Sequence, residues 1–104
     1  MIVHRSQVVM TAHIAAWIDD QPARIEWLLI CLARHNRHDW GDLDPTDKRA
    51  NDHAAAAQDG RILSRYELPT ALVDEMADDS AIWIITDDLD DPDAATTILW
   101  PSDY

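Results

Sequence analysis

Aspartates gather in a short connection between two apolar runs, and their type and spacing point to the binding of cations. The stretch from Trp83 to Trp100 reads WIITDDLDDPDAATTILW, in which five of the seven residues from 87 to 93 are aspartates. Short carboxylates held near the backbone present acceptor oxygens to arginine and lysine, much as phosphates do. Together with acids of the preceding connection they form a candidate surface for a basic partner. The candidate residues are Asp74, Glu75, Asp78, Asp79, Asp87, Asp88, Asp90, Asp91 and Asp93.

The same acids have a competing interpretation that needs no partner. A charged loop stays solvated and discourages the pairing of sheet edges between molecules. A calcium loop of the EF-hand type is excluded, because a pattern that starts at Asp87 or Asp88 lacks both the glycine and the final glutamate. Binding of a basic partner and simple solvation therefore remain the two main interpretations, and a calcium site of another type is a third.

Histidines and aspartates in the middle of the chain form a second candidate site. The candidates are His35, His38 and His53 with Asp39 and Asp42, and His35 and His38, three residues apart near the expected end of a helix, can share a face. Such a set would suit a small metal-dependent enzyme or regulator. No HExxH or paired CxxC pattern accompanies them, and a histidine at a helix C-terminus also interacts favourably with the helix dipole.

Other catalytic patterns are weak or missing. Ser64 has no GxSxG context, and the alternation around it places its side chain on the buried side of a strand. Gly41 and Gly60 are the two glycines in the chain, which excludes a glycine-rich phosphate loop. Cys31, the single cysteine, lies in an apolar helical pattern and is expected to be a buried residue without a disulfide. We expect no catalytic residue and no cofactor.

The net charge of −12 is concentrated toward the C-terminus. Residues 1–35 are neutral, residues 36–60 carry −3, and residues 61–104 carry eleven acids against two arginines. Such a field repels phosphates and attracts basic surfaces, so direct nucleic-acid binding is not expected. A genome-wide codon bias or adaptation to high salt is an alternative source of this composition, with seventeen Asp, three Glu and one Lys.

Capping residues and apolar spacing predict helices in the first half of the chain. Thr11 is a candidate N-cap for a helix through Ile18, and Pro22 suits the first position of a helix through about Asn36. Asp44 and Pro45 predict a helix over about 45–58 that Gly60 closes. Ile2 to Val9 is an expected short extended segment, and Ala71 to Ala77 an expected short helix.

The second half of the chain has the pattern of strands. RILSRYEL alternates, and AIWIIT and ATTILW are rich in β-branched and aromatic residues. We therefore expect an α+β fold, with about three N-terminal helices packed on a C-terminal three-stranded antiparallel sheet. The 104 residues suffice for a single compact domain, 1–104, and the apolar runs are too short to span a membrane. A cytoplasmic location is expected.

Five short motifs resemble a family of small plasmid-related proteins carried on plasmids and phages. The motifs are DWGDL at 39–43, ND at 51–52, GRILSRY at 60–66, WIIT at 83–86 and TTILWPSDY at 96–104. This sequence departs from the family pattern in the longer link before WIIT, extended by ELPTALVDEMADD, and in a turn before TT that lacks arginine. The resemblance implies a mobile-element origin and supplies no catalytic residue.

The resemblance and the clustered charge together lead to one functional hypothesis. We expect a non-catalytic inhibitor that acts as an acidic nucleic-acid mimic and binds the basic surface of a host defence complex, either a CRISPR effector or a restriction enzyme. The alternatives are a metal-dependent enzyme or regulator that uses His35, His38 and Asp39, and a self-associating accessory protein that forms a homodimer through an exposed sheet face.

Overall fold

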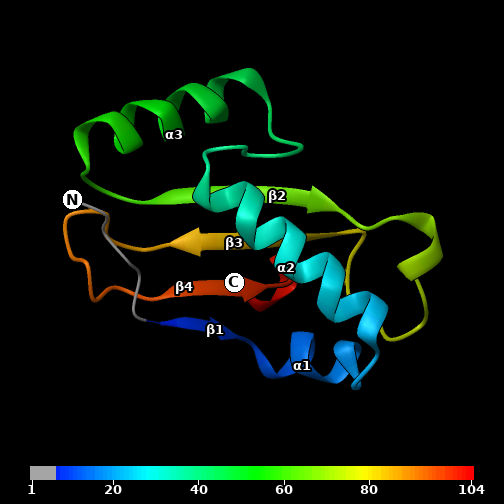
Figure 1. Ribbon diagram of the computed structural model, residues 1–104. Helices are drawn as coiled ribbons and strands as arrows, with labels where there is room; N and C mark the ends of the chain where they lie inside the picture. The colour runs from blue at the N-terminus through cyan, green and yellow to red at the C-terminus, as the bar shows by residue number, and fades with distance from the viewer. Residues whose placement is uncertain (1–6) are drawn as a thin grey trace.

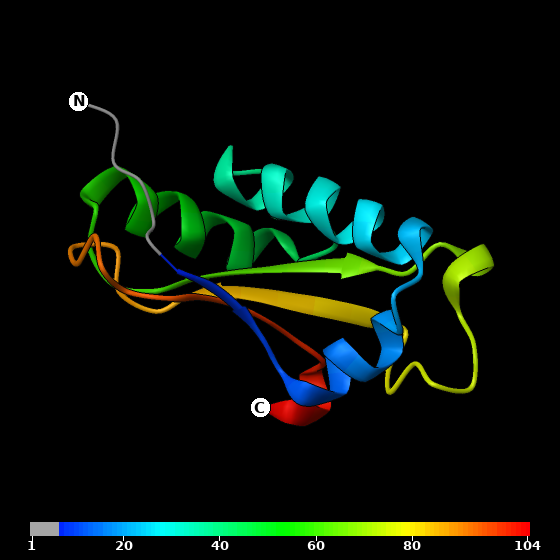
Figure 2. The ribbon, with the colours of Figure 1, turned by 60° about the horizontal axis from the view of Figure 1, so that its bottom comes forward.

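The structure, a computed structural model, describes residues 7–104 as a four-stranded sheet with α2 and α3 on one face and α1 beside the C-terminal turn (Figures 1 and 2). Figure 2 shows α2 and α3 above the sheet, and the chain end with its last short turn on the other side. The fold class is therefore α+β. In chain order the elements are β1 (Val8–Met10), α1 (Ala12–Ile18), α2 (Pro22–Asn36), α3 (Pro45–Ala57), β2 (Ile62–Glu67), η1 (Thr70–Leu72), β3 (Ala81–Thr86), β4 (Thr96–Leu99) and η2 (Pro101–Asp103).

The sheet is mixed, with the strand order β1-β4-β3-β2. Strands β2, β3 and β4 form the expected antiparallel meander, whereas β1 pairs in parallel with β4 and adds a fourth strand. The expectation of a three-stranded antiparallel sheet was wrong in this respect. Strand β1 has three exposed residues and thus no alternating burial, and its partner lies almost ninety residues away. The first part of the expected extended segment, residues 2–6, lies outside the described residues.

The helix starts agree with the capping residues, but the end of α3 and the expected short helix at 71–77 do not agree with the prediction. Thr11 caps α1, Pro22 begins α2, and the Asp44 side chain accepts the Asp47 backbone N–H at 2.8 Å. Gln58 (φ 52°), not Gly60, takes the left-handed position after α3. The expected helix from 71 to 77 shortens to the turn η1.

The core lies between the sheet and the helices. Alternation along β2 directs Ile62, Ser64 and Tyr66 inward, as the sequence predicts. Trp17 of α1 packs edge-to-face on Trp100, with 5.4 Å between ring centroids, and closes one end of the core. The main cluster contains Ile14, Trp17, Ile18, Leu28, Cys31, Tyr66, Leu68, Ile82, Ile84, Ile98 and Trp100.

The outer edge of β2 is closed by the loop before α3. The Arg65 backbone N–H donates to the Trp40 carbonyl (3.1 Å), and the Asp42 N–H donates to the Arg65 carbonyl (2.7 Å). The Asn51 side chain donates to the Leu63 carbonyl (2.7 Å) and accepts the Leu63 N–H (3.2 Å). These bonds occupy the backbone groups that an edge strand otherwise offers to another chain.

Gly41 makes this closure sterically feasible. Its φ is +75°, and a Cβ at this position would lie 2.1 Å from the Arg65 carbonyl oxygen and 2.6 Å from the Tyr66 ring. Gly60 has a similar φ of +83°, but a Cβ there would meet no atom within 4 Å. A side chain at Gly60 would therefore have only the penalty of a positive φ, whereas a side chain at Gly41 would also have the penalty of steric overlap.

Gly41→Ala should destabilise the fold much more than Gly60→Ala. Both variants carry the penalty of a left-handed residue, about 1–2 kcal/mol, and Gly41→Ala must also move the loop off β2, for a total of about 3 kcal/mol or more. Urea denaturation of both variants measures the difference in the free energy of unfolding. Equal losses in the two variants would show that the close approach at Gly41 does not constrain the fold.

Candidate functional site

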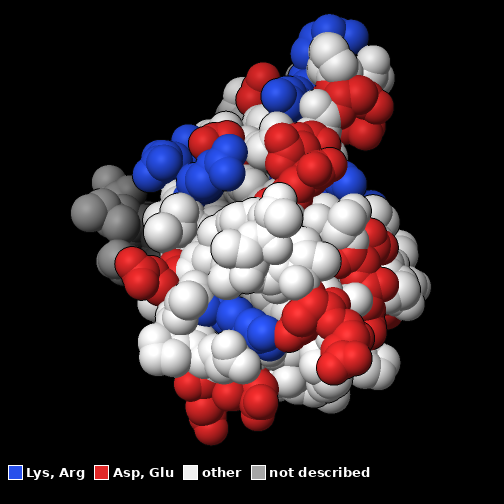
Figure 3. Space-filling model, turned by 90° about the vertical axis from the view of Figure 1, so that its right-hand side faces the viewer, with Lys and Arg blue, Asp and Glu red and all other residues white. Residues whose placement is uncertain are grey.

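The acids of the candidate surface form two groups at opposite ends of β3. The connection 69–80 precedes this strand and the turn 87–93 follows it, so the strand separates them (Figure 1). Figure 3 looks at the end that carries the 69–80 connection and shows separate acidic groups divided by uncharged and basic atoms. The nine residues therefore do not make one continuous negative face.

In the connection before β3, the fold itself uses much of the negative charge. Asp74 forms an ion pair with Arg24, whose guanidinium also donates to the Trp17 carbonyl and lies 5.2 Å from the Trp17 ring centroid. Arg24 is only 8% exposed, so loss of its carboxylate partner would leave a buried charge. Asp79 accepts the Ser80 backbone N–H at 2.7 Å.

The turn after β3, residues 87–93, is a different kind of acidic group. All five aspartates are exposed, whereas Leu89 turns inward: its N–H donates to the Gly60 carbonyl (2.8 Å), and its side chain packs on the Trp40 cluster. A hydrogen bond with Asp90 and its nearby charge raise the pKa of the Asp88 carboxyl. The turn is thus anchored at its centre, and its five aspartates remain exposed. We call residues 87–93 the acidic hairpin.

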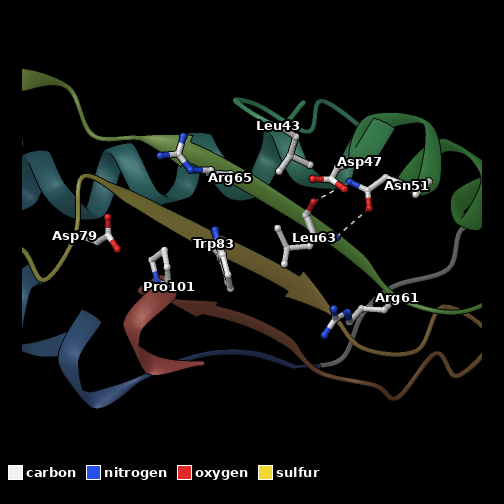
Figure 4. A pocket seen from close by; sticks show the side chains of 10 residues that line it. Leu43, Asp47, Asn51, Arg61, Leu63, Arg65, Asp79, Trp83 and Pro101 are labelled. Carbon is white, nitrogen blue, oxygen red and sulfur yellow. Dashed lines mark hydrogen bonds between the residues drawn. The ribbon is translucent and has the colours of Figure 1, made fainter. Parts of the chain in front are cut away.

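A groove of about 610 Å³ runs along β2 and β3 and reaches α3, whose residues Asp47, Ala50 and Asn51 line one side of it (Figure 4). Trp83 projects into its middle from β3, with Arg65 toward one end and Arg61 toward the other. Tyr104 packs edge-to-face on Trp83 (5.7 Å between centroids), and the Arg61 guanidinium lies 5.5 Å from the Tyr104 ring centroid. The remaining lining residues are Leu43, Leu63, Asp79 and Pro101.

His35 lies at the centre of a buried chain of hydrogen bonds. Its Nδ1 is 2.6 Å from Ser64 Oγ and its Nε2 is 2.9 Å from Thr86 Oγ1, which is in turn 2.9 Å from Thr96 Oγ1. All four residues are at most 2% exposed. Burial, with the nearby charge of His38, lowers the pKa of His35 to about 4. The Ser64 hydroxyl and the imidazole therefore tie α2 to three strands and face no substrate.

His38 and Asp39 are engaged separately from His35. The His38 ring stacks on Trp40 with 5.1 Å between centroids, and Arg34 binds both carboxylate oxygens of Asp39, at 2.8 and 3.2 Å. The Arg34 hydrogen bonds lower the pKa of Asp39. The geometry does not bring the candidate ligand set of His35, His38 and Asp39 together around one point.

A different cluster of potential ligands forms between three distant segments. Within residues 7–104, His13, Asp78 and Asp103 have ligand atoms that all lie within 4.8 Å of one another. Asp78 belongs to the candidate acidic surface, but His13 and Asp103 were missed. No spacing in the sequence could reveal them, because the three residues come from α1, the 69–80 connection and η2.

Comparisons with known proteins give no match. No protein-family model, curated protein or solved structure matches the chain. No helix among residues 7–104 combines the length and apolar character needed to cross a membrane. The site must therefore be interpreted from its own geometry.

His35 should make folding stability depend on pH between about 4 and 6.5. Its folded pKa, about 4, lies below the ordinary value of 6.5, so in this interval the unfolded chain binds more protons than the folded protein. The contribution of His35 to the free energy of unfolding is fully present above pH 6.5 and falls by about 3 kcal/mol as the pH approaches 4. Denaturation at several pH values measures the slope, which His35→Gln should flatten and exposed His53→Gln should preserve. A slope unchanged in His35→Gln would contradict this assignment.

Proposed function

We propose that this protein is a non-catalytic, mobile-element inhibitor that binds the basic nucleic-acid-binding surface of a host defence complex, a CRISPR effector or a restriction enzyme. The observation that carries the proposal is the anchored acidic hairpin. It presents five exposed carboxylates from one short turn whose centre is held by Leu89. A turn that is already fixed in one conformation loses less conformational entropy when it binds a partner.

The electrostatics of the acidic hairpin favour a cationic partner. Five exposed aspartates within seven residues form a concentrated negative charge, which an arginine or lysine of a partner would offset. Charge complementarity chiefly speeds association and makes it sensitive to salt. The hairpin is therefore the steering element of the proposed interface.

The open groove supports the proposal by supplying an anchor. Trp83, Tyr104 and Arg61 belong to the residue types that dominate binding energy at protein interfaces. Strand β3 leads from Trp83 in the groove to the acidic hairpin at its end, so both features share one strand. The groove residues are thus placed to slow dissociation of the complex, after the acidic hairpin has steered its association.

Two of the family-like motifs, DWGDL and ND, lie where the loop before α3 and α3 itself meet β2. In DWGDL, Asp39 binds Arg34, Trp40 is buried and Gly41 approaches β2; in ND, Asn51 pairs with Leu63. The segments that depart from the family pattern are the connection before β3 and the acidic hairpin. We infer that the family resemblance concerns the scaffold, and that this chain's target is set by its own loops.

Neutralising part of the acidic hairpin should weaken inhibition. The variant Asp87→Asn, Asp90→Asn and Asp93→Asn removes three exposed charges, and the matched control Asp19→Asn, Asp20→Asn and Glu26→Gln removes three elsewhere. DNA mobility-shift assays with a panel of purified CRISPR effectors and restriction enzymes measure inhibition. We expect the hairpin variant to lose at least about tenfold in potency, about 1.4 kcal/mol, and the control to resemble the wild type.

Two further measurements sharpen this test. Raising the salt concentration should slow association of the wild type with its target, and Tyr104→Ala should mainly speed dissociation. Failure of the wild type to inhibit any complex in the panel would reject the proposed target class. Equal inhibition by the hairpin variant and its control would reject the hairpin as the binding element.

Self-association is a second candidate function, favoured by apolar side chains beside the β1 edge. Val8, Met10 and Leu29 are 47%, 45% and 61% exposed and line a groove of about 540 Å³ between β1, α1 and α2. This surface, rather than the open sheet face, would meet a second copy. Because like charges repel, such a dimer should strengthen with salt, opposite to the partner complex. Light scattering that shows a monomer at both low and high salt would reject self-association.

A further inference from the structure

We propose that His13, Asp78 and Asp103 form a binding site for a divalent transition metal, with zinc as the fitting ion. The site is independent of the proposed inhibitor function. It joins the start of α1, the connection before β3 and the C-terminal turn η2, which are far apart in the sequence.

Asp103 is held in a fixed orientation by the fold. Its side chain is 7% exposed, and its Oδ2 accepts the Thr11 hydroxyl at 2.6 Å and the Trp100 backbone N–H at 3.2 Å. These bonds direct Oδ1 toward His13, whose Nδ1 lies 2.5 Å away. Hydrogen bonds that orient a ligating carboxylate in this way are typical of metal sites.

The other two ligands are free to adjust. The His13 and Asp78 side chains are 70% and 43% exposed, and His13 Nδ1 lies 4.0 Å from Asp78 Oδ2. Ligands about 2.1 Å from a tetrahedral ion lie about 3.4 Å from one another. To reach this value on binding zinc, the 2.5 Å contact of His13 with Asp103 must open by about 0.9 Å and its 4.0 Å contact with Asp78 must shorten by about 0.6 Å.

The chemistry of the set selects the ion. One imidazole nitrogen and two carboxylate oxygens suit zinc, with solvent at the fourth position, whereas calcium prefers six or more oxygens. Two carboxylates offset the charge of a divalent cation. The hydrogen bond and charge of Asp103, together with the charge of Asp78, raise the pKa of His13, so a proton and the metal compete for Nδ1.

Isothermal titration of the full chain with zinc chloride tests the site. We expect one zinc per chain, weaker binding as the pH falls, and a loss of affinity of at least about tenfold in His13→Ala and in Asp78→Asn. His53→Ala, which removes an exposed histidine from α3, is the matched control and should bind as the wild type does. The thermal midpoint should rise with zinc in the wild type and in this control alone.

The outcomes separate a metal site from a simple ion pair. Asp78→Asn leaves the His13–Asp103 pair intact, so it tests the site without disturbing that contact. Absence of stoichiometric zinc binding by the wild type, or unchanged affinity in either ligand variant, would overturn the proposal. A nuclear magnetic resonance spectrum in which zinc shifts the His13 ring signals would identify the ligand directly, and signals that stay in place would reject it.

Discussion

The close approach of the Gly41 backbone to β2 is the constraint on which the sheet edge depends. Hydrogen bonds on both sides of Gly41, from Arg65 to Trp40 and from Asp42 to Arg65, leave no space for a side chain at that point. Once the loop is seated, the Tyr66 hydroxyl donates to the Asp39 carbonyl at 2.6 Å, and Trp40 donates to Asp52 of α3. The loop thus closes the edge and positions α3, whose cluster in turn receives Leu89 of the acidic hairpin.

Local signals in the sequence predicted correctly those features in which a residue's role depends on its neighbours along the chain. Thr11, Pro22 and Asp44 mark helix starts because a cap acts on the following turn, and alternation identifies β2 because one face is buried. Features that depend on distant partners were not predictable. Strand β1 exists through its pairing with β4, and the expected helix at 71–77 is replaced where Asp74 binds both Arg24 and the Met76 N–H.

The same distinction applies to the candidate site. The acidic hairpin could be identified because its charge is contiguous in sequence, but its separation from the other acids follows from the position of β3 between them. The predicted grouping of His35 and His38 in one metal site was wrong for the opposite reason. His35 and His38 are close in sequence, yet the ring of one is buried against Ser64 and Thr86 and the ring of the other stacks on Trp40. Proximity along the chain did not determine a shared environment.

The excess of aspartate over glutamate has a physical explanation that separates it from general acidity. A short carboxylate reaches nearby backbone N–H groups, which a longer glutamate side chain does less well. Aspartates that accept backbone N–H groups include Asp39, Asp42, Asp44, Asp74, Asp79, Asp88, Asp91 and Asp103. Compositional bias would not by itself place carboxylates at so many turns and caps. Within the acidic hairpin both Asp88 and Asp91 have such a role, so the shape of this turn depends on the same short carboxylates that give it its charge.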